Sequence, residues 1–211
     1  MAPDPTTFDR VFKFLICGGK AVGKKTLLSS FCTEGDEEGI WTTLTVDDEK
    51  ILVEATVSQK WDEKAAKGFD AVALVFSTTD LFSFEYTLEL HNDMERSMTD
   101  RLPVVFIENK MDVVEESQME KRLVEGEIRK RHKRLYRVSA LKEFNVMHPF
   151  AYLIEKLTRH RKDENANERK QSSSVNSSSA PSNPSVVEAW TEPVAPDPTV
   201  TPPKKNKCTL M

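Results

Sequence analysis

Short apolar runs alternate with amphipathic stretches over the first 162 residues of the chain. Runs rich in β-branched and aromatic residues predict strands, whereas apolar positions three or four apart predict helices. The predicted strands are 11–17, 42–46, 51–57, 71–76, 104–107 and 135–138. The predicted helices start near Lys24, lie around 82–94, and cover 118–132 and 145–161. Strands that alternate with helices in this order are typical of an α/β fold with a mostly parallel sheet.

Three segments of this pattern allow more detailed expectations. The apolar runs 42–46 and 51–57 flank Asp47-Asp48-Glu49-Lys50, which predicts a β-hairpin. Two helices show apolar residues at helical spacing. In the first these residues are Phe82, Tyr86, Leu90 and Met94. In the last helix they are Phe150, Ile154 and Leu157. Cys17 lies inside an apolar run and is predicted to be buried.

The composition changes sharply after about residue 162. Residues 163–203 are rich in Ser, Asn, Pro and Glu, so they bury too little apolar surface to offset the entropy of ordering. The predicted organisation is therefore a flexible N-terminus over 1–8, a globular α/β domain over 9–162, a disordered linker over 163–203 and a short C-terminal segment over 204–211.

Charge and composition exclude several classes of function. The formal charge of −4 argues against nucleic-acid binding, which needs a basic surface. No apolar run approaches the roughly 20 residues that a membrane-spanning helix needs. The first residues resemble neither a signal peptide nor an N-myristoylation site, so synthesis in the cytosol is expected. The basic run 129–134 at a helix end is interpreted as a solvated terminus that complements the helix dipole, with membrane or partner contact as the alternative.

Residues 18–24 fit the pattern G-x-x-x-x-G-K and lie between a predicted strand and a predicted helix. Glycines allow the backbone to wrap a phosphate, and the N–H groups at a helix start favour an anion. The alternative is a glycine-containing turn that matches by chance, which this context disfavours. The candidate phosphate-binding residues are Gly18, Lys20, Ala21, Val22, Gly23, Lys24, Lys25 and Thr26.

Lys25 breaks the phosphate-binding pattern, because a Ser or Thr whose hydroxyl ligates Mg²⁺ is expected after Lys24. Thr26 comes one residue late and is the remaining candidate metal ligand in this segment. An ammonium cannot coordinate a metal ion and repels it. Either Lys25 supplies the positive charge that Mg²⁺ normally brings, or it turns outward and metal binding is weakened.

Two further motifs follow predicted strands. Asn109-Lys110-Met111-Asp112 resembles the N-K-x-D signature of the GTPase superfamily, in which the Asp pairs with guanine while the Asn and Lys brace the loop. Ser139-Ala140-Leu141 resembles the partner element, whose backbone N–H contacts the guanine oxygen. Each motif lies where a strand of an open α/β sheet ends, which is where such sheets bind ligands.

Together these motifs resemble the Ras superfamily across about residues 8–161. Residues 73–80, 83–85, 135–139, 144–146 and 152–156 are similar to the Rab subfamily associated with hedgehog signalling and cilia. The resemblance implies a P-loop NTPase-type G domain over 9–162 that binds GTP and GDP, with Mg²⁺ as the usual cofactor. It further implies a monomer that acts in vesicle trafficking or signalling through effector and regulatory proteins.

The regions that sense the γ-phosphate in this family depart from its pattern. The stretch between Lys24 and the hairpin is roughly nine residues shorter than in Rab relatives, and none of Thr33, Thr42 and Thr43 clearly matches the Mg²⁺-binding Thr. After strand 51–57 the family's D-x-x-G-Q is absent. Strand register puts Val57 at the metal-linked Asp position, whereas a looser alignment matches Trp61-Asp62 to a W-D pair.

Gln59 is the one candidate for the catalytic Gln of the family, but no glycine precedes it. Lys20 occupies a position at which the family usually has a small residue. We therefore predict guanine nucleotide binding with slow or absent hydrolysis, since positioning and electrostatics dominate phosphoryl transfer. The alternatives are an active switch with compensating residues and a scaffold that acts independently of nucleotide. An incorrect gene model or a splice form is the other explanation for the missing stretches.

The last four residues, Cys208-Thr209-Leu210-Met211, fit the C-a-a-X pattern for farnesylation of the cysteine. One lipid chain binds membranes only marginally, and nearby lysines supply a second signal against anionic lipids. The lysines are Lys204, Lys205 and Lys207. We predict prenylation at Cys208 and localisation to the cytoplasmic face of the plasma membrane or endosomes; the alternative is an unmodified tail.

Overall fold

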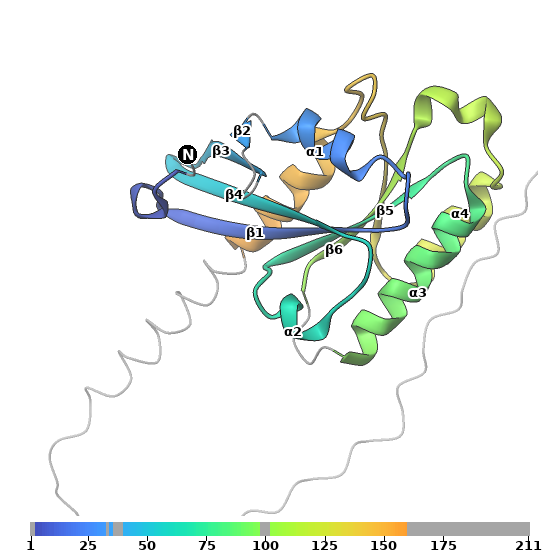
Figure 1. Ribbon diagram of the computed structural model, residues 1–211, viewed down its shortest axis with the longest axis horizontal. Coiled ribbons are helices and arrows are strands. Elements are labelled where there is room, and N and C mark those ends of the chain that lie inside the picture. Colours follow the sequence, from blue (N-terminus) through green and yellow to red (C-terminus); the bar gives the residue numbers. More distant parts are fainter. Residues whose placement is uncertain (1–2, 33, 36–39, 98–101, 160–211) are drawn as a thin grey trace, which may run out of the picture. The chain divides into compact units, whose positions relative to one another are not determined.

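Figure 1 shows the computed structural model of the protein, which describes residues 3–32, 34–35, 40–97 and 102–159. The predicted linker 163–203, the segment 204–211 with Cys208, and Thr33 lie outside these residues. In chain order the elements are η1 (Pro5–Thr7), β1 (Arg10–Cys17), α1 (Lys24–Phe31), β2 (Glu34–Gly35), β3 (Ile40–Val46), β4 (Glu49–Ser58), α2 (Glu63–Ala66), β5 (Ala71–Ser77), α3 (Leu81–Ser97), β6 (Val104–Asn109), η2 (Met111–Glu116), α4 (Lys121–Lys130) and β7 (Arg134–Arg137). Residues 147–159 form a further helix.

The strands form one sheet in the order β2-β3-β4-β1-β5-β6-β7. The five strands from β4 to β7 in this order are parallel, while β2 and β3 add an antiparallel edge. The prediction of a mostly parallel α/β sheet is therefore confirmed. Each of the six predicted strands matches an observed strand with ends that differ by no more than two residues. The short elements β2 and α2 were not predicted.

The predicted hairpin joins β3 and β4 through a turn tighter than expected. Val46 pairs with Glu49, so only Asp47 and Asp48 lie in the turn. Their φ angles are 51° and 65°, and positive φ at both central residues is what a type I′ turn requires. Asp tolerates this backbone region better than most residues, which explains why the chain can reverse here without glycine.

The sheet separates two apolar layers, because successive side chains of a strand point to opposite faces. On β1, Phe14 and Ile16 belong to one buried cluster, and Leu15 and Cys17 belong to the other. The first cluster also includes buried residues of α1 and of the helix 147–159, and the second includes buried residues of α3 and α4. Figure 1 shows these helices on the two sides of the sheet. Cys17 is buried as predicted, and burial raises the pKa of its thiol to about 11.

The buried face of α3 differs from the predicted one. Leu90 and Met94 are buried, but Phe82 is 79% exposed, so its assignment to the apolar face was wrong. The Ser77 N–H donates to Ser83 Oγ at 3.0 Å, which fixes the first turn with Ser83 against the sheet. The residues that α3 buries are Ser83, Phe84, Thr87, Leu90, His91 and Met94.

Two other predicted helices are shorter than expected for backbone reasons. The charged helix begins at Lys121 instead of 118, because Glu120 has an extended backbone and caps it. The last helix begins at residue 147, because Asn145 has a φ of 61°, outside the helical region. Its predicted apolar face is confirmed: Phe150, Ile154 and Leu157 are buried.

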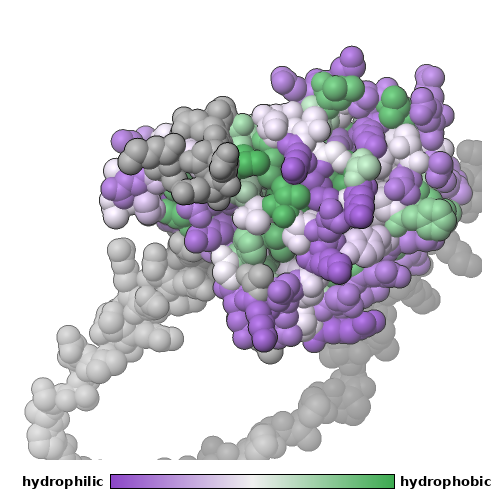
Figure 2. Space-filling model, in the orientation of Figure 1, coloured by the Kyte–Doolittle hydropathy of each residue, from purple (hydrophilic) through white to green (hydrophobic). Residues whose placement is uncertain are grey.

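The surface of the described residues is mostly polar. In the view of Figure 2 hydrophilic side chains surround a smaller hydrophobic area near the middle of the face. None of the helices in the described part of the chain combines the length and apolarity that crossing a membrane demands. Since β4, β1, β5, β6 and β7 are parallel, their carboxyl ends share one edge of the sheet. The phosphate-binding motif follows the end of β1, and the two guanine motifs follow the ends of β6 and β7.

Candidate functional site

The loop 18–24 joins β1 to α1 and depends on its glycines. An added Cβ at Gly18 lies 2.1 Å from the Val75 carbonyl oxygen, so β5 leaves no room for a side chain there. Gly23 caps α1 with a φ of 89°, and an added Cβ lies 2.5 Å from Asn109 Nδ2. The loop is therefore packed directly against the strands that carry the other motifs. This is the backbone form that cradles phosphate at a helix start.

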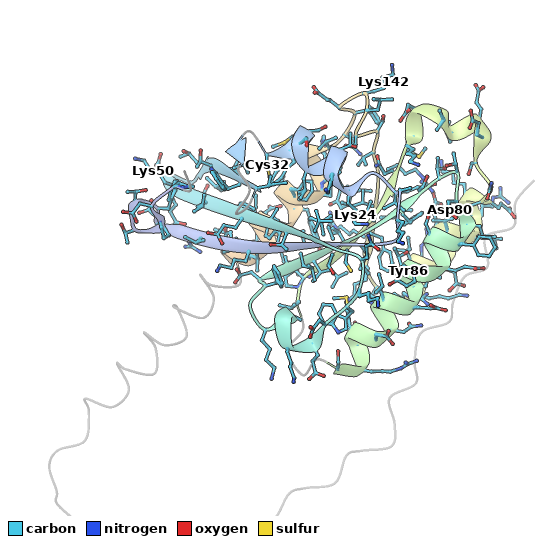
Figure 3. The ribbon with its side chains drawn as sticks, viewed as in Figure 1. Lys24, Cys32, Lys50, Asp80, Tyr86 and Lys142 are labelled. Carbon is cyan, nitrogen blue, oxygen red and sulfur yellow. The ribbon has the colours of Figure 1, made fainter. Side chains whose placement is uncertain are left out.

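Lys24 is buried at the first position of α1, and its ammonium lies inside the loop. Its Nζ donates to the Gly18 carbonyl at 2.8 Å and also to the Gly19 carbonyl. Burial lowers the pKa of this lysine. Lys24, Asp80 and Tyr86 gather toward the end of the sheet to which β1 leads (Figure 3). The ammonium is thus held by the main chain at the point where a phosphate would meet the loop.

A hollow of about 280 Å³, here called the phosphate hollow, opens beside this loop. It is lined by Lys20, Ala21, Gly23, Lys24, Lys25, Thr26, Val57 and Gln59. Lys25 is exposed, yet it lines the hollow together with Lys20 and Lys24. This placement favours the first of the two interpretations of Lys25, in which its charge acts at the phosphate site. Val22 is buried beneath the loop.

The loops predicted to bind guanine are residues 109–112 and 138–142, called the guanine loops below. Asn109, at the end of β6, is only 2% exposed. Its Nδ2 donates to the Val22 carbonyl at 2.9 Å, and its Oδ1 accepts the Ala140 N–H at 3.0 Å. One side chain therefore joins both guanine loops to the phosphate loop. This agrees with the bracing role that the sequence motif implies.

Asp112 and Ser139 connect the two guanine loops at their outer side. Ser139 Oγ donates to Asp112 Oδ1 at 2.5 Å and accepts the Lys142 N–H at 3.1 Å. Lys110 has a φ of 68°, a left-handed conformation that turns the chain directly after β6. Leu141 is 70% exposed, so it contributes backbone and no buried side chain. The predicted residues of both motifs are brought together.

An ion-pair network under the guanine loops was missed by sequence reasoning. Glu108 is buried, and its carboxylate accepts from Arg137 Nε at 2.9 Å. Arg137 also donates to Glu125 of α4 at 2.8 Å. A charged residue directly before Asn109 in an apolar strand was the available signal, because a buried carboxylate needs a partner. The network ties β6, β7 and α4 together just below the loops.

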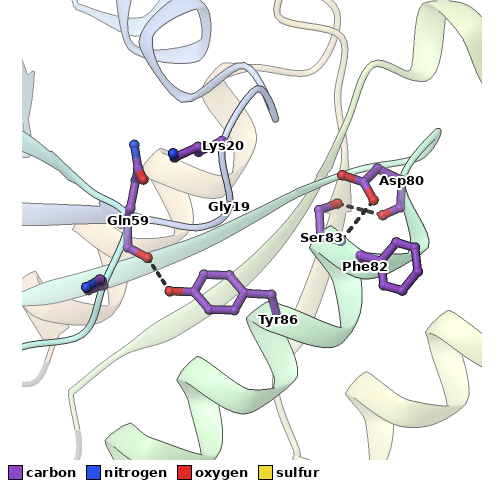
Figure 4. A pocket seen from close by; sticks show the side chains of 8 residues that line it. Gly19, Lys20, Gln59, Asp80, Phe82, Ser83 and Tyr86 are labelled. Atoms are coloured by element: carbon purple, nitrogen blue, oxygen red, sulfur yellow. Dashed lines mark hydrogen bonds between the residues drawn. The ribbon is translucent and has the colours of Figure 1, made fainter.

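A second hollow of about 360 Å³, the side hollow, lies between the phosphate loop and α3. It is lined by Gly19, Lys20, Gln59, Lys60, Asp80, Phe82, Ser83 and Tyr86. Tyr86 Oη donates to the Gln59 carbonyl at 2.7 Å, which attaches α3 to the chain that follows β4 (Figure 4). Gln59 and Lys20 therefore border both hollows. Asp80, Ser83 and Tyr86 were not predicted as site residues.

Comparison with known proteins decides the family. A family model described as "Ras family" matches residues 13–159. The chain belongs to the Ras family. It is a member of this family of small GTP-binding proteins, as the motif order implied.

Several curated proteins resemble the chain. It is 26% identical over 164 residues to the human EF-hand calcium-binding domain-containing protein 4B. This match covers 71% of this chain and 22% of the human protein. The chain is 31% identical over 136 residues to the Ras-like protein family member 11B of Xenopus tropicalis, and this match covers 54% of this chain and 55% of the relative. The human GTP-binding protein REM 1 is 27% identical over 124 residues, and this match covers 51% of this chain and 42% of REM 1. The chain thus spans about a fifth to half the length of these relatives. None of these three names is that of a Rab protein, so the Rab branch stays a prediction.

The residues around the phosphate loop do not fit Mg²⁺, the usual cofactor of the Ras family. Mg²⁺ prefers oxygen ligands in near-octahedral geometry. The described side chains that line the phosphate hollow offer the Thr26 hydroxyl and the Gln59 amide, beside three lysines and Val57, and none of them is a carboxylate. Among the described residues, no group of three or more His, Cys, Asp or Glu side chains is arranged to hold a metal ion.

The candidate threonines of β3 and the Trp61-Asp62 pair do not line the phosphate hollow, whereas Val57 does. Thr42 is buried within β3, and Thr43 pairs with Leu52 of β4. Trp61 Nε1 donates to Ser97 Oγ at 2.9 Å, and Asp62 accepts the Lys64 N–H at 2.9 Å at the start of α2. Both residues of the looser W-D alignment are therefore occupied in holding α2 and α3. Val57 lies in β4 opposite Ile16 and lines the hollow, as strand register predicted.

Proposed function

We propose that this Ras-family protein holds GDP or GTP with little dependence on Mg²⁺ and hydrolyses GTP slowly or not at all. It does so while tethered to the cytoplasmic face of membranes, as a Rab-like regulator of vesicle trafficking or signalling. The observation that carries the proposal is the contrast within one site. The guanine loops are braced by a buried Asn109, whereas the phosphate hollow has Val57 and Lys25 where metal-linked oxygens belong.

The guanine loops support specific recognition of the base. Asp112 is exposed, and one of its carboxylate oxygens accepts from Ser139. A carboxylate has two oxygens with about four acceptor sites, so capacity remains for the N1–H and amino group of guanine. Adenine presents no such pair of adjacent donors. The Ala140 N–H is already used by Asn109, so the guanine oxygen would rely on neighbouring backbone donors of the same loop.

The phosphate hollow supports binding of the phosphates by cations alone. Lys24 would contact the terminal phosphates from inside the loop, and Lys20 and Lys25 would add charge from its rim. Charge-assisted hydrogen bonds from ammonium to phosphate oxygen are roughly twice as strong as neutral ones. Lysines can thus replace part of the electrostatic contribution of Mg²⁺ to affinity. They do not replace its fixed geometry, on which in-line phosphoryl transfer depends.

The same hollow offers little for hydrolysis. Catalysis of phosphoryl transfer rests on positioning the water and stabilising the developing charge. Gln59 is exposed and follows β4 without a glycine beside it, held through its backbone by Tyr86. No described acid lines the phosphate hollow to order an attacking water. Slow turnover follows from these two features together.

The membrane part of the proposal rests on sequence. Cys208 in a C-a-a-X ending, with Lys204, Lys205 and Lys207 before it, provides a prenyl chain and a polybasic segment. Incubation with purified farnesyltransferase and labelled farnesyl diphosphate tests this directly. We expect label on the full-length chain and none on Cys208→Ser. Equal labelling of both, or of neither, contradicts the anchor.

Nucleotide affinity with and without metal separates the proposal from its two rivals. Titration of fluorescent GDP and GTP into the full chain, in excess MgCl₂ and in excess EDTA, should give dissociation constants within about threefold of each other. Single-turnover GTP hydrolysis should be no faster than in Lys24→Ala. Affinity that collapses in EDTA, together with turnover, supports the active switch and overturns the proposal. Absence of binding in both buffers leaves the nucleotide-independent scaffold.

A further inference from the structure

A third hollow lies at the opposite edge of the sheet from the nucleotide site. It has a volume of about 330 Å³ and is called the basic hollow. It is formed by the C-terminal ends of α3 and α4, the beginnings of β6 and β7, and the helix 147–159. The parallel strands end at the nucleotide site, so their beginnings lie at the other edge. The basic hollow is therefore a separate site.

The cations around the basic hollow exceed the carboxylates that pair with them. Arg131 donates to the Glu127 carboxylate at 3.0 Å, and Lys133 lies 3.2 Å from the Glu95 carboxylate. Arg134 and Lys156 also line the hollow, and within the described residues neither forms an ion pair. Arg131 and Lys133 are paired with carboxylates, whereas Arg134 and Lys156 are exposed and add two positive charges that form no ion pair within the described residues. Arg131 Nε adds a buried donor that has no acceptor in the described part of the chain.

An aromatic ring holds the two uncompensated cations in place. The Arg134 guanidinium lies over the Tyr152 ring at 4.3 Å from its centroid, and Lys156 Nζ lies 5.9 Å from the same centroid. The Tyr152 ring is itself 6.2 Å from the ring of Tyr136. A guanidinium stacked on a ring keeps the N–H groups of its edge available, and that planar edge matches phosphate oxygens. Tyr152 thus orients both cations, and Glu155, the carboxylate that acts on Arg134, is itself paired with Arg159.

We propose that the basic hollow binds the phosphate monoester groups of an inositol phosphate, presented by an anionic membrane lipid. A phosphate monoester carries nearly two negative charges at neutral pH, which matches the two cations that lack a carboxylate. Arg134 and Lys156 would contact the phosphate oxygens, with Arg131 adding charge from the α4 end. Glu95 borders the hollow, and its pairing with Lys133 reduces its repulsion of the ligand.

The predicted prenyl anchor at Cys208, with the lysines before it, favours a lipid as the source of the phosphate. This part of the inference rests on the proposed membrane tether. The chemistry of the hollow does not, because a soluble inositol phosphate carries the same groups.

The test uses the full, unprenylated chain and two probes. Inositol 1,4,5-trisphosphate is titrated by calorimetry, and sedimentation is measured with vesicles containing phosphatidylinositol 4,5-bisphosphate or phosphatidylserine at equal charge. Arg134→Gln combined with Lys156→Gln should weaken binding of the soluble headgroup by about tenfold or more. The matched control, Arg129→Gln with Lys130→Gln, removes two charges from the same basic run outside the hollow and should change the affinity less than about twofold.

A second variant keeps the test decisive if the double change unfolds the protein. Tyr152→Leu removes the ring that orients both cations and should also weaken binding, whereas Tyr152→Phe should retain it. Equal affinity of the double variant and the control overturns the site. Equal sedimentation with both vesicle types, or tighter binding of an acidic phosphopeptide, overturns the lipid as its ligand. Headgroup binding without phosphoinositide-specific sedimentation assigns the site to a soluble phosphate and overturns the lipid source.

These outcomes are independent of the proposed function. Cys208→Ser abolishes prenylation without touching the hollow, and Lys24→Ala changes the nucleotide site at the other edge of the sheet. Failure of headgroup binding in a chain that binds GDP and accepts farnesyl contradicts only the basic hollow. Headgroup binding in a chain that does neither contradicts only the proposed function.

Discussion

The two halves of the nucleotide site are built in different ways. At the guanine loops, side chains are fixed by one another: Asn109 joins three loops, and Ser139 joins Asp112 to Lys142. Of the described residues that line the phosphate hollow, Lys24 alone is buried, while Lys25, Thr26 and Gln59 are exposed. One half is part of the folded core. The other half is a rim of side chains around a hollow.

This difference explains how binding and catalysis can separate within one Ras-family domain. The bracing residues of the guanine loops contribute to stability, because their loss leaves buried polar groups without partners. The residues that hold metal and water in this family contribute little to the fold. Under the proposed function, Val57 and Lys25 replace such residues here and reduce hydrolysis without unfolding the protein, while the guanine half persists.

The largest expected effect concerns the brace itself. Asn109→Ala removes two hydrogen bonds and leaves the Val22 carbonyl and the Ala140 N–H without their partner. We expect the free energy of unfolding to fall by about 3 kcal/mol. Chemical denaturation measures this. Asn92→Ala, at an exposed position of α3, is the matched control and should change it by less than about 0.5 kcal/mol. Similar losses in both variants would show that the guanine half is no more integral to the fold than the surface.

The second effect separates recognition from stability. Asp112→Ala should lower the affinity for GDP by about 100-fold, because it removes charge-assisted hydrogen bonds to the base. Asp112 is exposed, so unfolding should change by less than about 1 kcal/mol. Equilibrium titration with fluorescent GDP gives the affinity. Glu116→Ala, an exposed acid in the same segment, is the control and should leave it unchanged. An unaltered affinity in Asp112→Ala contradicts guanine recognition by this motif.

The fold was largely predictable because hydrophobic patterning and strand order act over short stretches. The errors lie where a polar residue decides an element's start or orientation. Ser83 orients the first turn of α3 through the Ser77 N–H, so Phe82 faces solvent against the expectation from its spacing. Asn145, with its positive φ, delays the last helix. Such side-chain and backbone choices follow from tertiary contacts and are not visible in periodicity.

The site could be predicted where a motif is continuous in sequence. Gly18, Lys24, Asn109 and Asp112 were expected from such motifs, and the structure places them at one edge of the sheet. The link from Tyr86 to Gln59 spans α3 and the end of β4, and the pair of Glu108 with Arg137 spans two strands. Neither partner identifies the other in sequence. Contacts between segments far apart in the chain are what the sequence alone left out.

The third effect tests whether the missing metal ligands explain the phosphate half. Val57→Asp combined with Lys25→Ser places a carboxylate and a hydroxyl in the phosphate hollow, both of which are suitable Mg²⁺ ligands. The ratio of GDP dissociation constants in EDTA and in MgCl₂ should rise from near one to about ten. Val57→Asn with Lys25→Ser lacks the charge and serves as control. A strong Mg²⁺ requirement already in the unaltered chain would remove the contrast between the two halves.

The smallest expected effect concerns Gln59, which the sequence predicts as the candidate for the family's catalytic Gln. Its side chain borders both hollows, but only its carbonyl is fixed, through the Tyr86 hydroxyl at 2.7 Å. A residue that positions the attacking water must hold its own side-chain amide in a defined place. The Gln59 side chain is exposed, and no hydrogen bond among the described residues holds its amide. Gln59→Ala should therefore change the single-turnover rate of GTP hydrolysis by less than about twofold.

Tyr86→Phe removes the hydrogen bond to the Gln59 backbone, and it should likewise change the rate of GTP hydrolysis by less than about twofold. A loss of tenfold or more in Gln59→Ala, with GTP affinity unchanged, would assign catalysis to this residue and make the phosphate half an active counterpart of the guanine half.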